Sequence, residues 1–474
     1  MLLAAVALLT TLHQGAECAP ASTTTTAPTE EPGLVRLSLD RVSLTDPHTP
    51  NSATSRWAVS GASSAEMLST GDYAYYAQIT VGTPVQAFTV QLDTGSSAMW
   101  LGSKDCNAKG NCNDRSGFDP TASSTFRDVS NGKSNGVKYG TGQVSGFDVT
   151  DTVTWGIYNI PQQQFILVDN EDSIIKNFND KQSDGLIGLA WQNGNTSSKL
   201  WYPSVINSLM ASKSIMQPVF SIWLNPSTID TTTSNMKKNG GELVFGGISS
   251  QRFTGSVRYY KVIDPYFWAV NMGSVSVWTA GSTATNVQAP TGRSALFDSG
   301  TSKIYLESSF LVKNVLTPIY GSLGKSVPAS SQLDSGFNTI PCESRQSLPD
   351  VSFTFGTDGV QYVLTQQDYV FVMSWNKKCG LSFMSGGSDT QWIFGDTFLR
   401  KFVSVYDFGK SSDFRGSDDG PRVGLAASAG VAPLESSSFV ATGNASTTQA
   451  GATSSAEQLV YGLVAAAVAA IVAL

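Results

Sequence analysis

Histidine is almost absent from this chain of 474 residues. The two that it has, His13 and His48, both precede the first segment that looks globular. If processing removes that leader, the mature protein has no histidine. Ser–His and Cys–His nucleophilic machinery and ordinary histidine-ligated zinc sites are then excluded. Acid–base chemistry near or below neutral pH would depend on carboxylates.

Charged residues are also scarce, at 14% of the chain, and acidic ones outnumber basic ones by 37 to 30. The formal net charge of −7 disfavours a phosphate-binding surface, since nucleic-acid binders concentrate Lys and Arg on one face. Long helical charge patterns are hard to find, while Gly, Ser and Thr are abundant. The composition therefore predicts strands and turns, and no nucleic-acid partner.

The N-terminus has the pattern of a targeting segment. An apolar run over residues 2–12 precedes Ala16-Glu17-Cys18, so we interpret 1–18 as a signal peptide, with a buried N-terminal helix as the alternative. Residues 19–68 are rich in Thr, Pro, Ser and Ala without sustained periodicity, which is typical of a removable pro-segment or flexible leader. We therefore expect the chain to enter the secretory pathway.

Five cysteines are present, and removal of Cys18 with the signal peptide leaves four. An even number in a secreted chain predicts disulfides, for which three pairings are possible. The members of each pair lie close in sequence and in different halves of the chain, which favours Cys106 with Cys112 and Cys342 with Cys379.

The C-terminus has the pattern of a glycolipid (GPI) attachment signal. Residues 459–474 are apolar and uncharged, and a polar spacer separates them from the small-residue triplet that begins at Asn444. We expect attachment at Asn444 and removal of 445–474, with Gly443 or Gly451 as alternative attachment points. A C-terminal membrane helix is the other interpretation, although such helices usually need about 20 apolar residues.

An internal repeat predicts the architecture. Two pairs of segments correspond: 91–97 with 296–302, and 184–189 with 391–396. Segment 91–97 contains Asp-Thr-Gly and segment 296–302 contains Asp-Ser-Gly, each after an apolar stretch. The interval from Asp93 to Gly188 is 95 positions, and the interval from Asp298 to Gly395 is 97. We therefore expect two like-built lobes that each supply one Asp to a shared cleft.

The expected fold is all-β and bilobal, with two duplicated β-barrel-like lobes over 69–248 and 249–426 and the active-site cleft between them. A Ser/Ala-rich stalk is expected over 427–444. Helical patterns are convincing at 200–210 and 310–320. Near the start, 73–81 and 88–92 alternate apolar and polar residues on either side of Gly82-Thr83-Pro84, which predicts a β-hairpin.

Two carboxyls that face each other across the lobes could carry out acid–base catalysis. Like charges within hydrogen-bond reach cannot both ionise, so the pair would share one proton over an acidic range. The ionised carboxylate can deprotonate a water molecule while its protonated partner donates to a scissile carbonyl. The apparent pKa values of such a pair belong to both groups together.

With these residues in view, the chain resembles the pepsin family of aspartic proteases over about residues 71–426. The resemblance implies an aspartic endopeptidase with Asp93 and Asp298 as its catalytic pair. Proton sharing of this kind is well known in aspartic proteases. The resemblance also implies polypeptide substrates, no metal or cofactor, and a monomer.

Several further residues match the pattern of that family. The hairpin around Val137-Lys138-Tyr139-Gly140-Thr141-Gly142 looks like the flap over the substrate, with Tyr139 closing and Gly140 and Thr141 offering backbone hydrogen bonds. Trp100 matches the partner of the flap tyrosine. The resemblance gives the turn residues these roles: substrate contact for Gly95, Gly300 and Thr301, hydrogen bonds to the outer carboxyl oxygens for Ser96 and Thr301, and bracing between the lobes for Thr94 and Ser299.

The leader departs from the family pattern, because it has few of the basic residues that pepsin-type pro-segments use to neutralise the dyad. The tail resembles that of fungal cell-surface aspartic proteases, which implies GPI anchoring to the plasma membrane or cell wall, with secretion as the alternative. Asn195-Thr196-Ser197 is a candidate N-glycosylation site. Two rival functions stay open: a catalytically silent binding protein on the same fold, and a glycosidase that uses two carboxylates.

Overall fold

The computed structural model of the chain describes most of the region predicted to be globular. The described residues are 35–43, 73–112, 116–140, 142–172, 183–190, 203–215, 217–225, 237–279, 281–282, 284–333, 336–373, 378–409, 420–431 and 434. The predicted signal peptide, the GPI signal with Asn444, the glycosylation site at Asn195 and the flap residue Thr141 lie outside them. Of the predicted pro-segment, only 35–43 is described.

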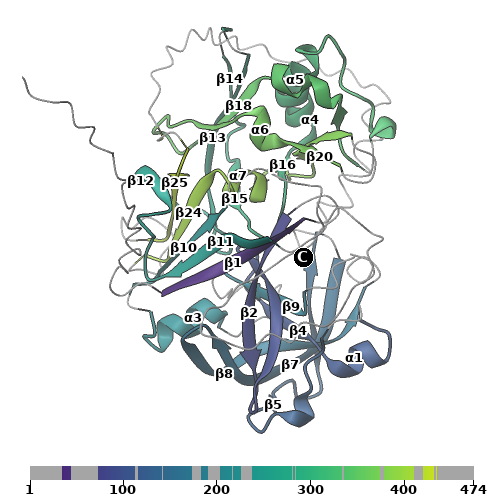
Figure 1. The fold of residues 1–474 in the computed structure, drawn as a ribbon, viewed down its shortest axis with the longest axis vertical. Helices are drawn as coiled ribbons and strands as arrows, with labels where there is room; N and C mark the ends of the chain where they lie inside the picture. Colours follow the sequence, from purple (N-terminus) through teal and green to yellow (C-terminus); the bar gives the residue numbers. More distant parts are fainter. Residues whose placement is uncertain are drawn as a thin grey trace, which may run out of the picture. The chain divides into compact units, whose positions relative to one another are not determined.

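Six strands of the first lobe close into a barrel (Figure 1). Their order around the ring is β2 (Tyr73–Val81), β3 (Gln86–Asp93), β9 (Gly185–Gly188), β4 (Met99–Gly102), β8 (Tyr158–Glu171) and β7 (Gly142–Trp155), which returns to β2. Strand β3 shows why the barrel forms: Phe88, Val90 and Leu92 alternate with more polar residues and point into the buried core. The hairpin of β2 and β3 confirms the predicted pairing of these two segments.

The second lobe repeats the central part of this arrangement. Strand β15 (Ser294–Phe297) runs parallel to β23 (Gln391–Phe394), which pairs antiparallel with β16 (Ile304–Leu306), and β16 runs parallel to β22 (Phe383–Ser385). Strands β3, β9, β4 and β8 have the same sequence of orientations. In the described residues most strands of the second lobe form an open eight-stranded sheet and a three-stranded sheet.

The register of the two lobes agrees residue by residue. Leu92, directly before the first Asp, pairs with Ile187, and Phe297, directly before the second, pairs with Phe394. The amide of Gly188 donates to the carbonyl of Ala98 over 2.8 Å, and that of Gly395 donates to Lys303 over 3.0 Å. Ala98 and Lys303 each lie five positions after their Asp, and the two glycines follow at nearly equal intervals of 95 and 97 positions, so the duplicated architecture predicted from the sequence is confirmed.

One sheet joins strands from both halves of the chain. It contains β12 (Phe253–Lys261), β25 (Arg422–Ser428), β24 (Phe402–Asp407), β10 (Val219–Leu224) and β11 (Lys237–Phe245), and it continues through β1 (Val35–Ser43) to β2. Figure 1 shows β1 beside β11 and β2. Contrary to the expectation that the leader lacks sustained periodicity, its residues 35–43 form strand β1. Its apolar residues Val35, Leu37 and Leu39 alternate with polar ones, as they do in a strand.

Helices are short and few in the described part of the chain. Helix α3 (Val205–Ala211) overlaps the second half of the predicted segment 200–210, and α4 (Ser308–Leu311), the π-helical turn Val312–Leu316 and α5 (Thr317–Gly321) together span 310–320. Among the described residues no helix is long and apolar enough to cross a membrane.

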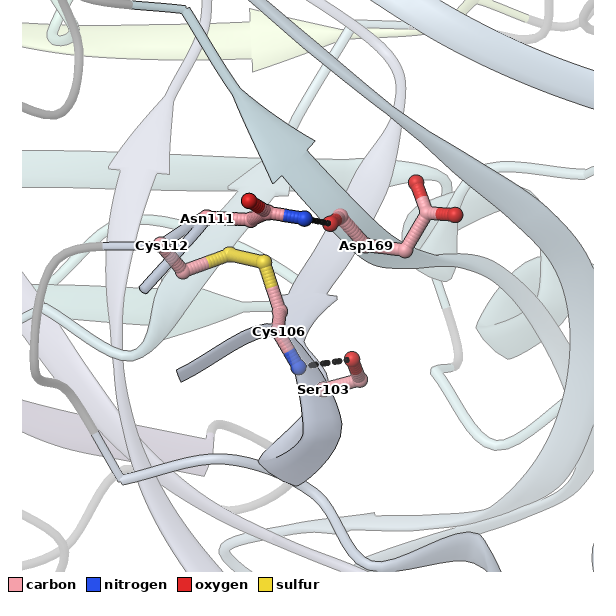
Figure 2. Close-up of a disulfide and its surroundings, with 5 residues drawn as sticks. All are labelled: Ser103, Cys106, Asn111, Cys112 and Asp169. Carbon is pink, nitrogen blue, oxygen red and sulfur yellow. Dashed lines mark hydrogen bonds between the residues drawn. A yellow bond between two sulfur atoms is a disulfide. The ribbon is translucent and has the colours of Figure 1, made fainter. Parts of the chain in front are cut away.

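Both predicted disulfides are present. Cys106 in helix α1 (Lys104–Ala108) bonds Cys112, and Cys342 bonds Cys379. Figure 2 shows the first of them, where the hydroxyl of Ser103 accepts the Cys106 amide over 3.0 Å and caps the helix. The pairings preferred on sequence proximity are therefore confirmed.

Candidate active site

Each repeat ends a buried strand on an aspartate. Asp93 is the last residue of β3, and Asp298 directly follows β15, where its amide donates to the carbonyl of Phe394 over 3.1 Å. The two residues are 5% and 8% exposed, so both are largely but not completely removed from solvent. The local fold thus fixes two carboxyls on rigid strand ends, which hold a site more precisely than mobile loops do.

The glycines of the two turns show how closely the lobes meet. A Cβ atom on Gly95 would lie 2.6 Å from Cγ of Asp298, and one on Gly300 would lie 2.5 Å from Oδ1 of Asp93. Each turn therefore places its bare glycine against the carboxyl of the other lobe, and any side chain there would collide with it. The structure brings the two predicted aspartates together.

Each carboxyl is also held by its own turn. The amide of Gly95 donates to Oδ1 of Asp93 over 2.8 Å, and the hydroxyl of Ser96 donates to Oδ2. In the second lobe the amide of Gly300 donates to Oδ1 of Asp298 over 2.8 Å, and Thr301 Oγ1 donates to Oδ2 over 2.6 Å. These donors stabilise the ionised form of each carboxyl.

A pair of buried hydroxyls braces the two turns against each other. Thr94 Oγ1 accepts the amide of Ser299 over 2.9 Å and donates to the carbonyl of Phe297 over 2.8 Å. In return, Ser299 Oγ accepts the Thr94 amide over 3.2 Å and donates to the carbonyl of Leu92 over 2.9 Å. The reciprocal bonds fix the separation of the two carboxyls.

The carboxyls interact electrostatically as well as sterically. Burial raises the pKa of Asp93 well above its ordinary value, and the charge of Asp298 raises it further. The hydrogen bond from Ser96 lowers this pKa, a hydrogen bond with Asp298 raises it, and the Gly95 amide lowers it slightly. A proton is therefore held on the pair at pH values where an isolated Asp would have lost it.

The predicted flap is a β-hairpin formed by β6 (Ser134–Tyr139) and β7, in which Tyr139 pairs with Gly142. Trp100 Nε1 donates to the hydroxyl of Tyr139 over 2.9 Å, and that hydroxyl is also hydrogen-bonded to Ser96. Burial, followed by the charge of Asp93, raises the pKa of Tyr139, so the phenol stays neutral. A chain of hydrogen bonds thus runs from Trp100 through Tyr139 and Ser96 to Asp93, while Gly140 is exposed at the hairpin tip.

Two residues near the dyad were not singled out from the sequence. Gln91 Nε2 donates to the carbonyl of Gly300 over 3.4 Å, and the Tyr406 hydroxyl lies 3.5 Å from Thr94 Oγ1. Gln91 had a usable signal, because it lies two positions before Asp93 and a strand places such residues on the same face. Tyr406 gave no comparable signal, because it lies on β24, and only the folded sheet brings this strand close to the turn that follows Asp93.

No three His, Cys, Asp or Glu side chains gather to hold a metal ion anywhere in the part of the chain that the structure describes. The residues around the dyad are carboxyls, hydroxyls and backbone amides. This set can bind and polarise a neutral polar group such as water or a peptide carbonyl.

Comparison with known proteins agrees with this geometry. The family model for eukaryotic aspartyl proteases matches residues 74–413. Gastricsin of Mus musculus is 29% identical over 75% of this chain and 81% of its own length, and gastricsin of Homo sapiens is 30% identical over 72% and 80%. Cathepsin D of Dictyostelium discoideum is 32% identical over 71% of this chain and 82% of its own length. The chain belongs to the eukaryotic aspartyl protease family and is an aspartic-type endopeptidase with the bilobal, all-β pepsin-like fold.

Proposed function

We propose that Asp93 and Asp298 are the catalytic pair of this endopeptidase and that they hydrolyse peptide bonds of proteins at acidic pH. The observation that carries the proposal is the contact of each turn glycine with the opposite carboxyl, which leaves the two acid groups within reach of one water molecule. The raised pKa of Asp93 supports a singly protonated pair in acid.

The reaction then needs no group beyond the pair and a water. The ionised carboxylate takes a proton from the water as its oxygen bonds to the scissile carbonyl carbon, and the protonated carboxyl donates to the carbonyl oxygen. When the tetrahedral intermediate collapses and the C–N bond breaks, the carboxyl that took the water's proton donates it to the departing amine, and the intermediate's hydroxyl returns its proton to the other carboxylate. We leave open which Asp holds the proton at the start, because the titration belongs to the pair.

An extended peptide would lie between the lobes under the flap. Tyr139, Gly140 and Thr141 would contact it from the hairpin, and Gly95, Gly300 and Thr301 from the two turns. Backbone amides and carbonyls at these positions suit a peptide, whose own backbone offers the complementary groups. This match favours a peptide over a glycan, so we rank the glycosidase alternative lower.

The test is cleavage of an unfolded protein at acidic pH by the wild type and by Asp93→Asn and Asp298→Asn. Asp105→Asn, an exposed position in α1, is the matched control for the chemical change. Both dyad variants should be inactive but folded by thermal melting, and the control should retain activity. Cleavage by either dyad variant at the wild-type rate would refute the proposal. Failure of the wild type to cleave while it binds a statine peptide would support a silent binding protein.

We further propose a route to the cell surface. Two disulfides favour folding in an oxidising compartment such as the secretory pathway. The proposed processing removes the signal peptide 1–18, the pro-segment 19–68 and the GPI signal 445–474, with glycosylation at Asn195 and the protein acting as a monomer. A phosphatidylinositol-specific phospholipase should release the protein from intact cells. Its retention after that treatment would favour a membrane helix or a wall linkage.

A further inference from the structure

Gln91 is a half-buried polar residue beside the dyad. On β3, residues Phe88, Val90 and Leu92 point into the barrel core, so Gln91 and Asp93 share the opposite face. Positions two residues apart along a strand are separated by about 7 Å. A substrate residue whose peptide bond lies at the dyad is therefore close enough for its side chain to reach Gln91.

On the β9 side, the neighbours of Gln91 on that face are apolar. Gln91 pairs with Leu186 on β9, and Leu186 pairs with Trp100 on β4. Leu186 and Trp100 belong to one buried cluster, against which Tyr139 of the flap packs. We call the surface formed by Gln91, Leu186, Trp100 and Tyr139 the Leu186 site. Gln91 and Trp100 lie about 10 Å apart across β9, with Leu186 between them.

The amide of Gln91 has a defined orientation in this site. Its Nε2 donates to the Gly300 carbonyl of the other lobe over 3.4 Å, so Oε1 is the end that remains available to accept a hydrogen bond. Within the described residues Oε1 has no hydrogen-bond partner, and the side chain is half-buried. The matching position in the second lobe is Leu296, which is 4% exposed and has no polar group to offer.

We propose that Gln91 determines specificity by accepting a hydrogen bond from a substrate side chain next to the scissile bond. The preferred side chain has an apolar stem, which Leu186 and Trp100 cover, and ends in a hydrogen-bond donor. A purely apolar side chain of the same size would fill the site and leave Oε1 without a hydrogen-bond partner, which costs free energy. This inference rests on the proposed function.

The test compares peptides that are identical except at the two residues flanking the cleaved bond. Each of these positions carries in turn Tyr, Phe or p-methoxyphenylalanine, which keeps the ring and oxygen of Tyr but has no donor. At one flanking position the wild type should prefer Tyr over Phe in kcat/KM about fivefold, which corresponds to about 1 kcal/mol. The methoxy compound should gain nothing over Phe.

Gln91→Leu should bring the Tyr-to-Phe ratio to about one, and Leu suits this strand because Leu296 occupies the matching place. Gln91→Met provides a second, unbranched variant in case the first fails to fold. Thr89→Val is the control, since Thr89 lies on the same face but one step further from Asp93. It should keep the wild-type ratio.

A wild-type ratio near one, an unchanged ratio in both Gln91 variants, or equal preference for Tyr and the methoxy compound would overturn the inference, while cleavage itself continued. Absence of cleavage of every peptide and of an unfolded protein by the wild type would instead overturn the proposed function, and this inference with it.

Discussion

The two lobes present the same acid group in different surroundings. Ser96 and Thr301 each donate a hydrogen bond to the Asp of their own lobe. Ser96 also links the Asp93 carboxyl to Tyr139 of the flap and through it to Trp100. The strands that position both carboxyls agree in register, and the turn glycines contact the opposite carboxyl in the same way. Duplication therefore explains why there are two matched acids, and the flap, formed by β6 and β7, explains how two identical groups become chemically different.

The strongest test of the symmetry is to add a methyl group to each turn. Gly95→Ala and Gly300→Ala each place Cβ within about 2.6 Å of the opposite carboxyl, so both should lower kcat/KM by about 100-fold. Gly321→Ala, where a Cβ meets open space, should leave kcat/KM unchanged. A large loss in one turn variant alone would show that the lobes do not contribute equally to the geometry.

The disulfides differ between the lobes in the length of chain that they close. The Cys106–Cys112 pair spans 6 positions and the Cys342–Cys379 pair spans 37. In the loop-entropy account they should stabilise the fold by about 2 and about 4 kcal/mol. Urea unfolding of the two double Cys→Ala variants should show the larger loss for the second lobe. Equal losses would indicate that side-chain packing, not loop length, determines how much each disulfide stabilises the fold.

The flap should make the first lobe more sensitive to loss of a hydroxyl. Tyr139→Phe removes the oxygen that Trp100 and Ser96 share, so kcat/KM should fall about tenfold, or about 1.4 kcal/mol. Tyr305 occupies the place in the second lobe that matches Trp100, and Tyr305→Phe should change kcat/KM by less than about twofold. A comparable fall in both variants would remove the proposed asymmetry.

The smallest expected effect is a pH dependence of stability. The pKa of the Asp93 carboxyl is raised above 3.8. The stability that this group contributes is therefore fully present below pH 3.8 and is lost as pH rises through the pKa of the folded state. Asp93→Asn should therefore gain stability relative to the wild type as pH increases from about 3 to 7.

Asp119 provides a control of opposite sign for the same measurement. The hydrogen bond with Lys104 lowers the pKa of Asp119 to about 2. The stability that this carboxyl contributes is therefore present above pH 3.8 and is lost as pH falls through about 2. Asp119→Asn should be less stable than the wild type at neutral pH. Melting curves across the pH range that showed the same sign for both variants would contradict the account.

The duplicated core was predictable because its signals are local. An apolar strand, an Asp-Thr/Ser-Gly turn and a later apolar-Gly segment recur at nearly equal spacing, and each element can be found within a few residues. The structure adds the register, in which Leu92 with Ile187 matches Phe297 with Phe394. The disulfide pairing followed from proximity in the sequence for the same reason.

Other features depend on contacts that the sequence does not display. Strand β1 had an alternating pattern, but the leader's Thr- and Pro-rich composition concealed it, and its partners β11 and β2 lie far along the chain. Tyr406 reaches Thr94 from a position 312 residues away. The short helices α6 (Gln366–Tyr369) and α7 (Asp396–Leu399) span about one turn each, which is too little for a helical period to show.

The central claim is that the two carboxyls titrate as a pair, and a carboxyl ¹³C NMR titration of Asp93 tests it most directly. The Asp93 signal can be assigned by its loss in Asp93→Asn, and then followed with pH in the wild type and in Asp298→Asn. Without the charge of Asp298, the apparent pKa of Asp93 should fall but stay above 3.8, because burial is the larger cause of its rise. An unchanged pKa in Asp298→Asn would contradict the pairing on which the proposed mechanism depends.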